Sequence, residues 1–237
     1  MSTYLFVHGA WHGGWCWEKI VSRLEKLGHK AIAPDLPGLG QDNTPLNRVT
    51  LELWRDHICD IAAAQSQPVV LVGHSRGGIV ISEVAEHRPK IVRTLVYVTA
   101  FLLRDKESLF DKAAQDPESL IVKNMVMSED KTSSTVRDEA LREGFYEECS
   151  EEDFIRARSL LRPEPSLPLA TPVRVTEGNW GGVPRVYIEC LRDKALRPHM
   201  QKQMYTTLPC RKVLSIDTDH SPFYSRPDEL VAHLRSV

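Results

Sequence analysis

Residues 71–77 read Leu-Val-Gly-His-Ser-Arg-Gly, and no other stretch of the chain says more about its architecture. The stretch holds a Gly-x-Ser-x-Gly pattern centred on Ser75, with apolar runs on either side at 68–72 and 79–85. A strand, a sharp turn and a helix are the setting in which this pattern exposes a nucleophilic serine. Side chains beside the serine would collide with the neighbouring strand and helix, which explains both glycines. A serine that only capped a helix would not need them.

Apolar strands and amphipathic helices alternate on both sides of this turn. The hydrophobic patterns predict strands at 4–7, 30–33, 69–72, 92–99, 185–190 and 212–216, and helices at 17–27, 51–64, 77–87, 198–207 and 228–236. Such alternation predicts an α/β fold, with a mostly parallel sheet of about six strands and helices on both faces.

The alternation is interrupted after residue 103. Residues 104–169 are charged, helix-forming and broken by prolines, and Ser150 has the character of a helix cap. We therefore expect a core made of 1–103 and 170–237, with 104–169 inserted as a helical lid. The insert follows the carboxyl end of a strand, which is the edge where open α/β sheets bind ligands. A helical decoration elsewhere on the surface is the alternative.

A serine hydroxyl needs a neighbouring base before it can act as a nucleophile. Of the nine histidines, His220 follows the last predicted strand and returns to the same sheet edge as Ser75. We expect His220 to be the base. Asp193, just after the strand at 185–190, is expected to orient its imidazole, with Asp105 as the competing acid.

Acyl transfer also needs hydrogen-bond donors for the developing oxyanion. The sequence places one at the backbone N–H of Arg76 and a second at Ala10, in the loop after the first strand. His8 and His12 are expected to support that loop. Since only the amide of Arg76 is used, its side chain is free, and a guanidinium there would favour substrates that carry a carboxylate.

Together these stretches resemble the plant methyl esterase and hydroxynitrile lyase group of α/β-hydrolases, which has bacterial esterase relatives. Residues 8–17 resemble the oxyanion loop of that group, 149–163 its lid helix, and 185–194 the strand and loop that carry its acid. The resemblance implies an α/β-hydrolase fold and cofactor-free hydrolysis of hydrophobic carboxylic esters. It also implies Ser75, Asp193 and His220 as a triad, with Ala10 and Arg76 as oxyanion donors.

Two positions depart from the lyase members of that group. Ser221 stands where those members carry a lysine after the catalytic histidine, and Gly9 stands where they carry a threonine. Both departures count against cyanohydrin cleavage, so a serine carboxylesterase is the leading prediction. Lyase-like C–C cleavage and a receptor-like hydrolase fold with little turnover stay open as alternatives.

The substrate pocket is expected to be apolar. The side chains and backbone expected to line it are Gly9, Trp11, Phe110, Leu120, Met125, Phe145, Phe154 and Ser221. Packing of the lid on the core is the alternative for the apolar lid residues. Aromatic methyl esters, pyrethroid-like esters and lactones all stay open as substrates.

Composition excludes several other classes of function. The net charge is −2 with acids and bases interspersed, so no nucleic-acid partner is expected. Five scattered cysteines without ligand spacing predict neither a disulfide framework nor a metal site, and fit a cytoplasmic protein. The apolar run at 4–7 is too short to span a membrane. A homodimer is compatible with the sequence, which does not fix the oligomeric state.

Overall fold

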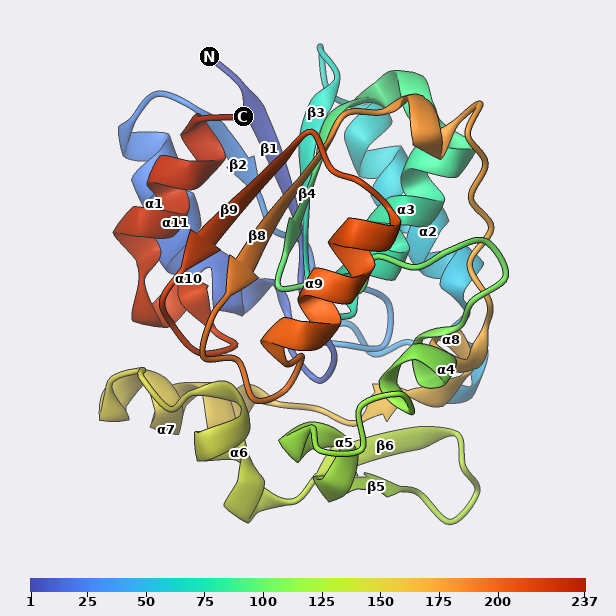
Figure 1. Cartoon of the computed structure of the whole chain (residues 1–237), viewed down its shortest axis with the longest axis vertical. Coiled ribbons are helices and arrows are strands. Elements are labelled where there is room, and N and C mark those ends of the chain that lie inside the picture. Colours follow the sequence, from blue (N-terminus) through green and yellow to red (C-terminus); the bar gives the residue numbers. More distant parts are fainter.

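The computed structural model describes residues 1–237, and its centre is a six-stranded sheet (Figure 1). The strand order is β2-β1-β3-β4-β8-β9, and every neighbouring pair is parallel. This arrangement confirms the predicted fold class. The strands are β1 (Thr3–Val7), β2 (Lys30–Ile32), β3 (Val69–His74), β4 (Val92–Val98), β8 (Arg185–Cys190) and β9 (Lys212–Ile216).

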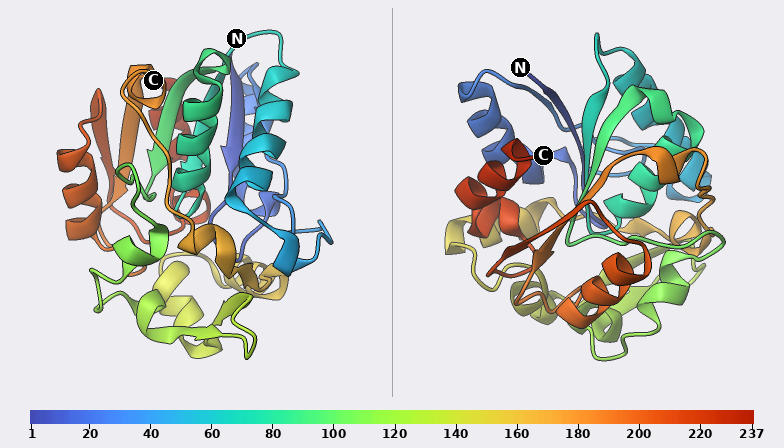
Figure 2. Two further views of the ribbon diagram at one scale, coloured as in Figure 1. Left: turned by 90° about the vertical axis from the view of Figure 1, so that its right-hand side faces the viewer. Right: turned by 45° about the horizontal axis from the view of Figure 1, so that its top comes forward.

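Helices cover both faces of the sheet (Figure 2). One face packs against α1 (Glu18–Lys26) and α11 (Pro227–Arg235), and the other against α2 (Leu51–Ala63), α3 (Gly77–His87) and α9 (Pro198–Thr207). The apolar run of β3 serves both faces, because successive strand residues point to opposite sides. Val70 and Val72 join the core beneath α1 and α11, while Val69 and Leu71 join the core beneath α2, α3 and α9.

The order of the strands creates a crevice beside β3. The chain passes from β1 to β2 on one side and then returns to place β3 on the other side of β1. Such a reversal opens a gap at the carboxyl ends of the strands, where open α/β sheets bind ligands. The loops that follow β1, β3, β4, β8 and β9 all meet at this edge.

Residues 104–169, which the sequence predicts to be an insert and which keep that name below, lie across the carboxyl edge of the sheet (Figure 1). The insert contains α4 (Leu109–Ala113), α5 (Leu120–Asn124), α6 (Asp138–Phe145), α7 (Glu151–Leu160) and α8 (Ser166–Ala170). It also contains a small antiparallel sheet of β5 (Met125–Met127), β6 (Ser133–Val136) and β7 (Glu164–Pro165). The sequence predicted only helices here, because strands of two to four residues are too short for hydrophobic alternation to reveal.

The remaining elements are short. They are α10 (Pro222–Ser225) and 3₁₀ turns at Gly14–Trp17, Leu46–Arg48, Pro89–Ile91 and Trp180–Gly182. None of the helices combines the length and the apolar character that crossing a membrane would require.

The two glycines of the Gly-x-Ser-x-Gly pattern are required by close backbone packing. A Cβ atom on Gly73 would lie 2.8 Å from the carbonyl oxygen of Gly77, and one on Gly77 would lie 2.6 Å from that of Val7. These are the collisions expected from the sequence, and backbone atoms cannot move aside as a flexible side chain can.

We expect Gly77→Ala to lower the free energy of unfolding by about 3 kcal/mol, because the added methyl group forces α3 away from β1. Urea denaturation would measure the change. Gly182→Ala is the matched control, since a Cβ atom there meets nothing within 4 Å. Equal stability of the two variants would contradict the packing argument.

Candidate active site

Ser75 occupies a strained position directly after β3. Its φ is 51°, in the left-handed region that a residue with a side chain rarely adopts. Such strain costs about 1–3 kcal/mol and is found mainly at functional sites. The turn is held by the Ser75 carbonyl, which accepts hydrogen bonds from the N–H groups of Gly78 at 3.1 Å and Phe101 at 3.0 Å.

His220 and Asp193 form a buried pair at the same edge. His220 Nδ1 lies 2.6 Å from Asp193 Oδ2, and each residue is at most 2% exposed. A carboxylate only accepts, so Nδ1 carries a proton, and in the neutral ring Nε2 is then the acceptor. This is the tautomer that a histidine needs to take a proton from a serine.

Asp193 is fixed by hydrogen bonds to both of its oxygens. Oδ1 accepts from the N–H groups of Ala195 at 2.7 Å and Leu196 at 2.8 Å, and Oδ2 also accepts from the Thr99 hydroxyl. Thr99 follows β4 and has a φ of 36°, which is unusual for a β-branched residue. Thr99 was not predicted from the sequence, although its place directly after a strand that neighbours the elbow was an available signal.

The competing acid Asp105 and the neighbouring Asp219 are directed elsewhere. Asp105 is exposed and accepts from the Val175 N–H at 3.2 Å. Asp219 is buried, but its oxygens accept from the N–H of Glu148 at 2.8 Å and the hydroxyl of Ser225 at 3.0 Å. Only Asp193 among these carboxylates contacts the imidazole of His220.

The imidazole of His220 lies between two aromatic rings. Its centroid is 4.6 Å from that of His74 and 5.5 Å from that of Phe145 in the insert. His74 Nε2 donates to the His220 carbonyl at 2.8 Å, which fixes the backbone beside the base. Burial lowers the pKa of His74 well below its ordinary value, so this ring stays neutral.

Two backbone N–H groups near Ser75 have no acceptor within the protein, and one of them belongs to the loop after β1. The N–H groups of Ala10 and Arg76 donate to no other group of the protein, and both residues line the same cavity as Ser75. His12 Nδ1 donates to the Ala10 carbonyl at 2.7 Å, and His8 Nδ1 to the Gly9 carbonyl at 2.9 Å. Burial lowers the pKa of His12 to about 4, so it acts here as a neutral hydrogen-bonding group.

A small apolar cavity lies above Ser75. Its volume is about 60 Å³, well below the roughly 300–1,000 Å³ typical of small-molecule sites. Polar groups are few: Ser75, Arg76, Ser119 and His220. The apolar lining consists of Ala10, Trp11, Phe101, Leu109, Phe110, Ala113, Ile121, Val122, Met125, Phe145, Leu169, Ala195 and Leu196.

Eight of the residues expected at the site therefore meet at one cavity. They are Ala10, Trp11, Ser75, Arg76, Phe110, Met125, Phe145 and His220. Asp193 lies behind His220 and reaches the cavity only through it.

Four residues expected in the pocket lie outside its lining. The space beside Gly9 is filled by His74 and Ser75, and Ser221 is completely buried with its hydroxyl unpartnered. Leu120 precedes Ile121 and Val122 on α5, which present the lining surface instead. Phe154 packs against Tyr146 and Arg142 within the insert. Sequence position alone does not show which side of a short helix faces inward.

The Arg76 side chain is not free, contrary to the expectation from the sequence. Its guanidinium is 1% exposed and pairs with Glu164 at 2.9 Å, from Nε to Oε1. It also lies 4.2 Å from the ring centroid of Trp54 and donates to the Gly9 carbonyl. Its charge is thus already paired with a buried carboxylate of the protein, which weakens the expected preference for carboxylate-bearing substrates.

Both halves of the insert are tied to the loops of the site. In the first half, the Leu120 N–H donates to the Lys194 carbonyl at 3.0 Å and the Ser119 hydroxyl to the Ala195 carbonyl at 2.7 Å. In the second half, the Arg162 N–H donates to the Trp11 carbonyl at 3.0 Å. The Trp11 indole also donates to the carbonyl of Ser134 in β6.

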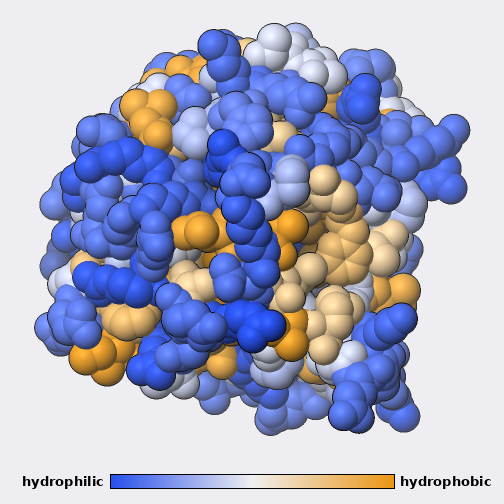
Figure 3. Space-filling view, turned by 60° about the horizontal axis from the view of Figure 1, so that its bottom comes forward, coloured by the Kyte–Doolittle hydropathy of each residue, from blue (hydrophilic) through white to orange (hydrophobic).

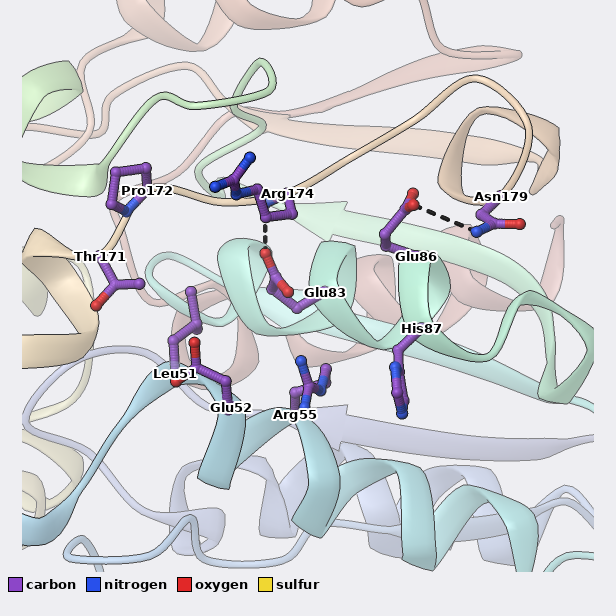
Figure 4. A pocket seen from close by; sticks show the side chains of 10 residues that line it. All are labelled: Leu51, Glu52, Arg55, Glu83, Glu86, His87, Thr171, Pro172, Arg174 and Asn179. Atoms are coloured by element: carbon purple, nitrogen blue, oxygen red, sulfur yellow. Dashed lines mark hydrogen bonds between the residues drawn. The ribbon is translucent and has the colours of Figure 1, made fainter.

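An apolar surface patch and a second, more polar cavity lie outside the site around Ser75. The face that carries the insert is mostly hydrophilic, with an apolar patch among the charged side chains (Figure 3). A second cavity of about 530 Å³ lies between α2, α3 and residues 171–179 (Figure 4). Its acids serve the backbone and nearby side chains: Glu83 accepts from the Arg174 N–H, and Glu86 from Asn179. No group of three or more His, Cys, Asp or Glu side chains is placed to hold a metal ion.

A parallel sheet with a strained serine turn after β3, and a His–Asp pair after its last two strands, defines the class of α/β-hydrolases. A model described as the alpha/beta hydrolase family matches residues 4–233. The chain belongs to this family, in its plant methylesterase-like group, which confirms the resemblance seen in the sequence.

Individual relatives match over nearly their full length. Methylesterase 7 of Arabidopsis thaliana is 30% identical over 247 aligned residues, covering 99% of this chain and 95% of the relative. The solved structure of polyneuridine aldehyde esterase is 26% identical, with a TM-score of 0.90 and coverage of 100% and 98%. A pyrethroid hydrolase from Sphingobium faniae JZ-2 is 29% identical, with a TM-score of 0.90 and coverage of 99% and 96%.

Proposed function

We propose that this chain is a serine carboxylesterase that hydrolyses neutral, hydrophobic carboxylic esters through Ser75, His220 and Asp193. Its family and its esterase relatives make it an ester-cleaving hydrolase. One observation carries the finer proposal: the bond from His220 Nδ1 to Asp193 makes Nε2 the acceptor of the neutral ring, and this imidazole lines one apolar cavity together with the strained Ser75.

In the first half of the reaction, His220 Nε2 takes the proton of the Ser75 hydroxyl while Oγ attacks the ester carbonyl. The carbonyl oxygen becomes an oxyanion, which accepts hydrogen bonds from the N–H groups of Ala10 and Arg76. Collapse breaks the bond to the alcohol, which leaves with the proton from His220. The product is an acyl-enzyme on Ser75.

In the second half, water replaces the alcohol. His220 takes a proton from the water as its oxygen attacks the acyl carbonyl, and the same two amides hold the second oxyanion. Collapse returns the proton to Ser75 and releases the carboxylic acid. Asp193 stays ionised throughout and stabilises the charged imidazole. These steps use only protein groups and water.

The insert acts as a lid in this proposal, with residues 1–103 and 170–237 as the core. Phe145 covers one face of the His220 ring, and Phe110 and Met125 close the cavity from the same side. Covering the site excludes water and strengthens the hydrogen bonds to the oxyanion. A cytoplasmic location and a homodimer remain predictions from the sequence.

The alternatives find less support. Cyanohydrin cleavage would need a cation for the departing cyanide, but Ser221 occupies the position of the lyase lysine, and the one cation at the cavity, Arg76, is paired with Glu164. Receptor-like binding would not need the proton-accepting tautomer of His220. Multiple turnover of p-nitrophenyl acetate, lost in Ser75→Ala, would support the esterase; a single stoichiometric burst would favour the receptor.

The apolar cavity also predicts which esters react. We expect kcat/KM for p-nitrophenyl butyrate to exceed that for mono-p-nitrophenyl succinate by about 100-fold or more, because the extra carboxylate would be buried in an apolar cavity whose one cation, Arg76, is already paired with Glu164. Parallel assays on the two esters at neutral pH measure the ratio. Equal values would contradict a neutral substrate.

A further inference from the structure

The ion pair between Arg76 and Glu164 joins the two parts of the molecule that enclose the site. Arg76 follows the elbow serine, and Glu164 begins β7 in the insert. The two side chains are 1% and 0% exposed. Burial raises the pKa of the Glu164 carboxyl, and the neighbouring guanidinium counteracts this by favouring the charged form. Removing two charges from water is costly, so a buried pair is weak evidence for stability alone.

We propose that Arg76 and Glu164 are positioning residues that hold the loop after β1, and thereby aim the Ala10 N–H at the oxyanion. The inference rests on the proposed esterase function and deepens it. Arg76 would then serve the oxyanion twice: its own backbone N–H donates directly, and its side chain sets the direction of the other donor.

The peptide between Gly9 and Ala10 carries both the carbonyl that Arg76 binds and the proposed oxyanion donor. Arg76 Nη2 donates to the Gly9 carbonyl at 2.9 Å. That carbonyl and the Ala10 N–H belong to one planar trans peptide, so they point in opposite directions. Fixing the carbonyl therefore fixes the N–H. The positive charge on the carbonyl side also polarises the peptide and strengthens its N–H as a donor.

The next peptide, between Ala10 and Trp11, is held by Glu164 and His12. Glu164 Oε2 accepts from the Trp11 N–H at 2.8 Å, while His12 holds the Ala10 carbonyl. Trp11 has a φ of 63°, a left-handed conformation that a bulky side chain rarely adopts without support. Both peptide planes that flank the Ala10 Cα are thus held by the pair and its neighbours.

The contacts of this cation require an arginine. The guanidinium reaches Glu164 through Nε and Gly9 through Nη2, while its plane lies against Trp54. The Trp54 indole is itself anchored by a bond to the Pro37 carbonyl at 2.9 Å. A lysine is a single point charge and cannot serve both acceptors in this fixed geometry.

The test is the double variant Arg76→Met/Glu164→Gln. It removes both charges together, so no unpaired charge is left buried, and the amide that replaces the carboxylate still offers an oxygen to the Trp11 N–H. We expect a folded protein in which kcat for p-nitrophenyl butyrate falls by about 10- to 100-fold with little change in KM. The reason is that the Ala10 N–H stabilises negative charge that develops only in the transition state. Arg76→Lys, which keeps the charge without the fork, should lie between the double variant and the wild type.

A pair of inhibitors separates positioning from general damage to the site. An alkyl trifluoromethyl ketone forms an oxyanion on Ser75, whereas the matching methyl ketone binds without one. In the double variant, affinity for the first should fall by the same factor as kcat, and affinity for the second should not change. Glu83→Gln is the matched control: Glu83 is also buried and accepts a backbone N–H, from Arg174 at 2.6 Å, but lies in the distant polar cavity.

The outcomes are distinct. A loss confined to kcat and to the trifluoromethyl ketone supports the inference. A kcat within threefold of the wild type, a loss that falls on KM, or an equal loss in Glu83→Gln overturns it while leaving the esterase intact. If the wild type itself turns over no ester, the proposed function fails, and this inference fails with it.

Discussion

Replacement of Ser75 by alanine is expected to lower kcat for p-nitrophenyl butyrate by about five to six orders of magnitude, since the attacking oxygen is lost and the remaining groups cannot act without it. The fold should persist, because the turn is held by the backbone carbonyl of Ser75 and not by its hydroxyl. Steady-state assays on purified protein, with circular dichroism as a check of folding, measure both effects.

Two further variants sharpen this test. Ser82→Ala removes another buried serine hydroxyl, which lies in α3 and bonds to the Gly78 carbonyl and to the hydroxyl of Tyr97 in β4, and it should leave most of the activity. Ser75→Gly should be as inactive as alanine yet more stable by about 1 kcal/mol, because glycine adopts a φ of 51° without strain. Activity above one hundredth of the wild type in Ser75→Ala would mean that another group is the nucleophile.

Asp193→Asn is expected to lower kcat by about 10⁴-fold with little change in shape. An asparagine at this position can donate its NH₂ to Nδ1 of His220, which would hold the ring in the tautomer that cannot accept the proton of Ser75. The pH dependence of kcat/KM in the variant and the wild type would show whether the base itself is affected.

The matched control is Asp105→Asn, which changes the other acid that the sequence left open. Asp105 is exposed and bonds only to the Val175 N–H, so its replacement should leave kcat within about twofold. A large loss in Asp105→Asn together with an active Asp193→Asn would reverse the assignment of the acid.

The sequence predicted the core of the molecule closely because its signals there are local. Apolar strands, amphipathic helices and glycines at tight turns depend on neighbours along the chain, and the helix predicted at 77–87 is α3 residue for residue. The place of His220 and Asp193 followed from a rule of topology, since residues after parallel strands gather at one edge.

What the sequence did not reveal depends on contacts between distant segments. In the sequence, Glu164 is one of many charged residues of the insert. Only the folded structure brings it into contact with Arg76, which lies 88 positions earlier in the chain. The same holds for Thr99, which meets Asp193 across 94 residues. A charge on a surface and a charge in a buried pair look alike in one sequence, so the paired state of Arg76 could not be foreseen.

The two halves of the insert serve different parts of the catalytic apparatus. The first half bonds to the loop beyond Asp193 through Lys194 and Ala195, and the second half bonds to the loop beyond β1 through Trp11. A molecule with its insert displaced would therefore lose the support of both the acid and the oxyanion amides at once. If the insert acts as the proposed lid, a substrate must enter before these supports are in place, and an ester that cannot be enclosed would escape attack even while touching the serine.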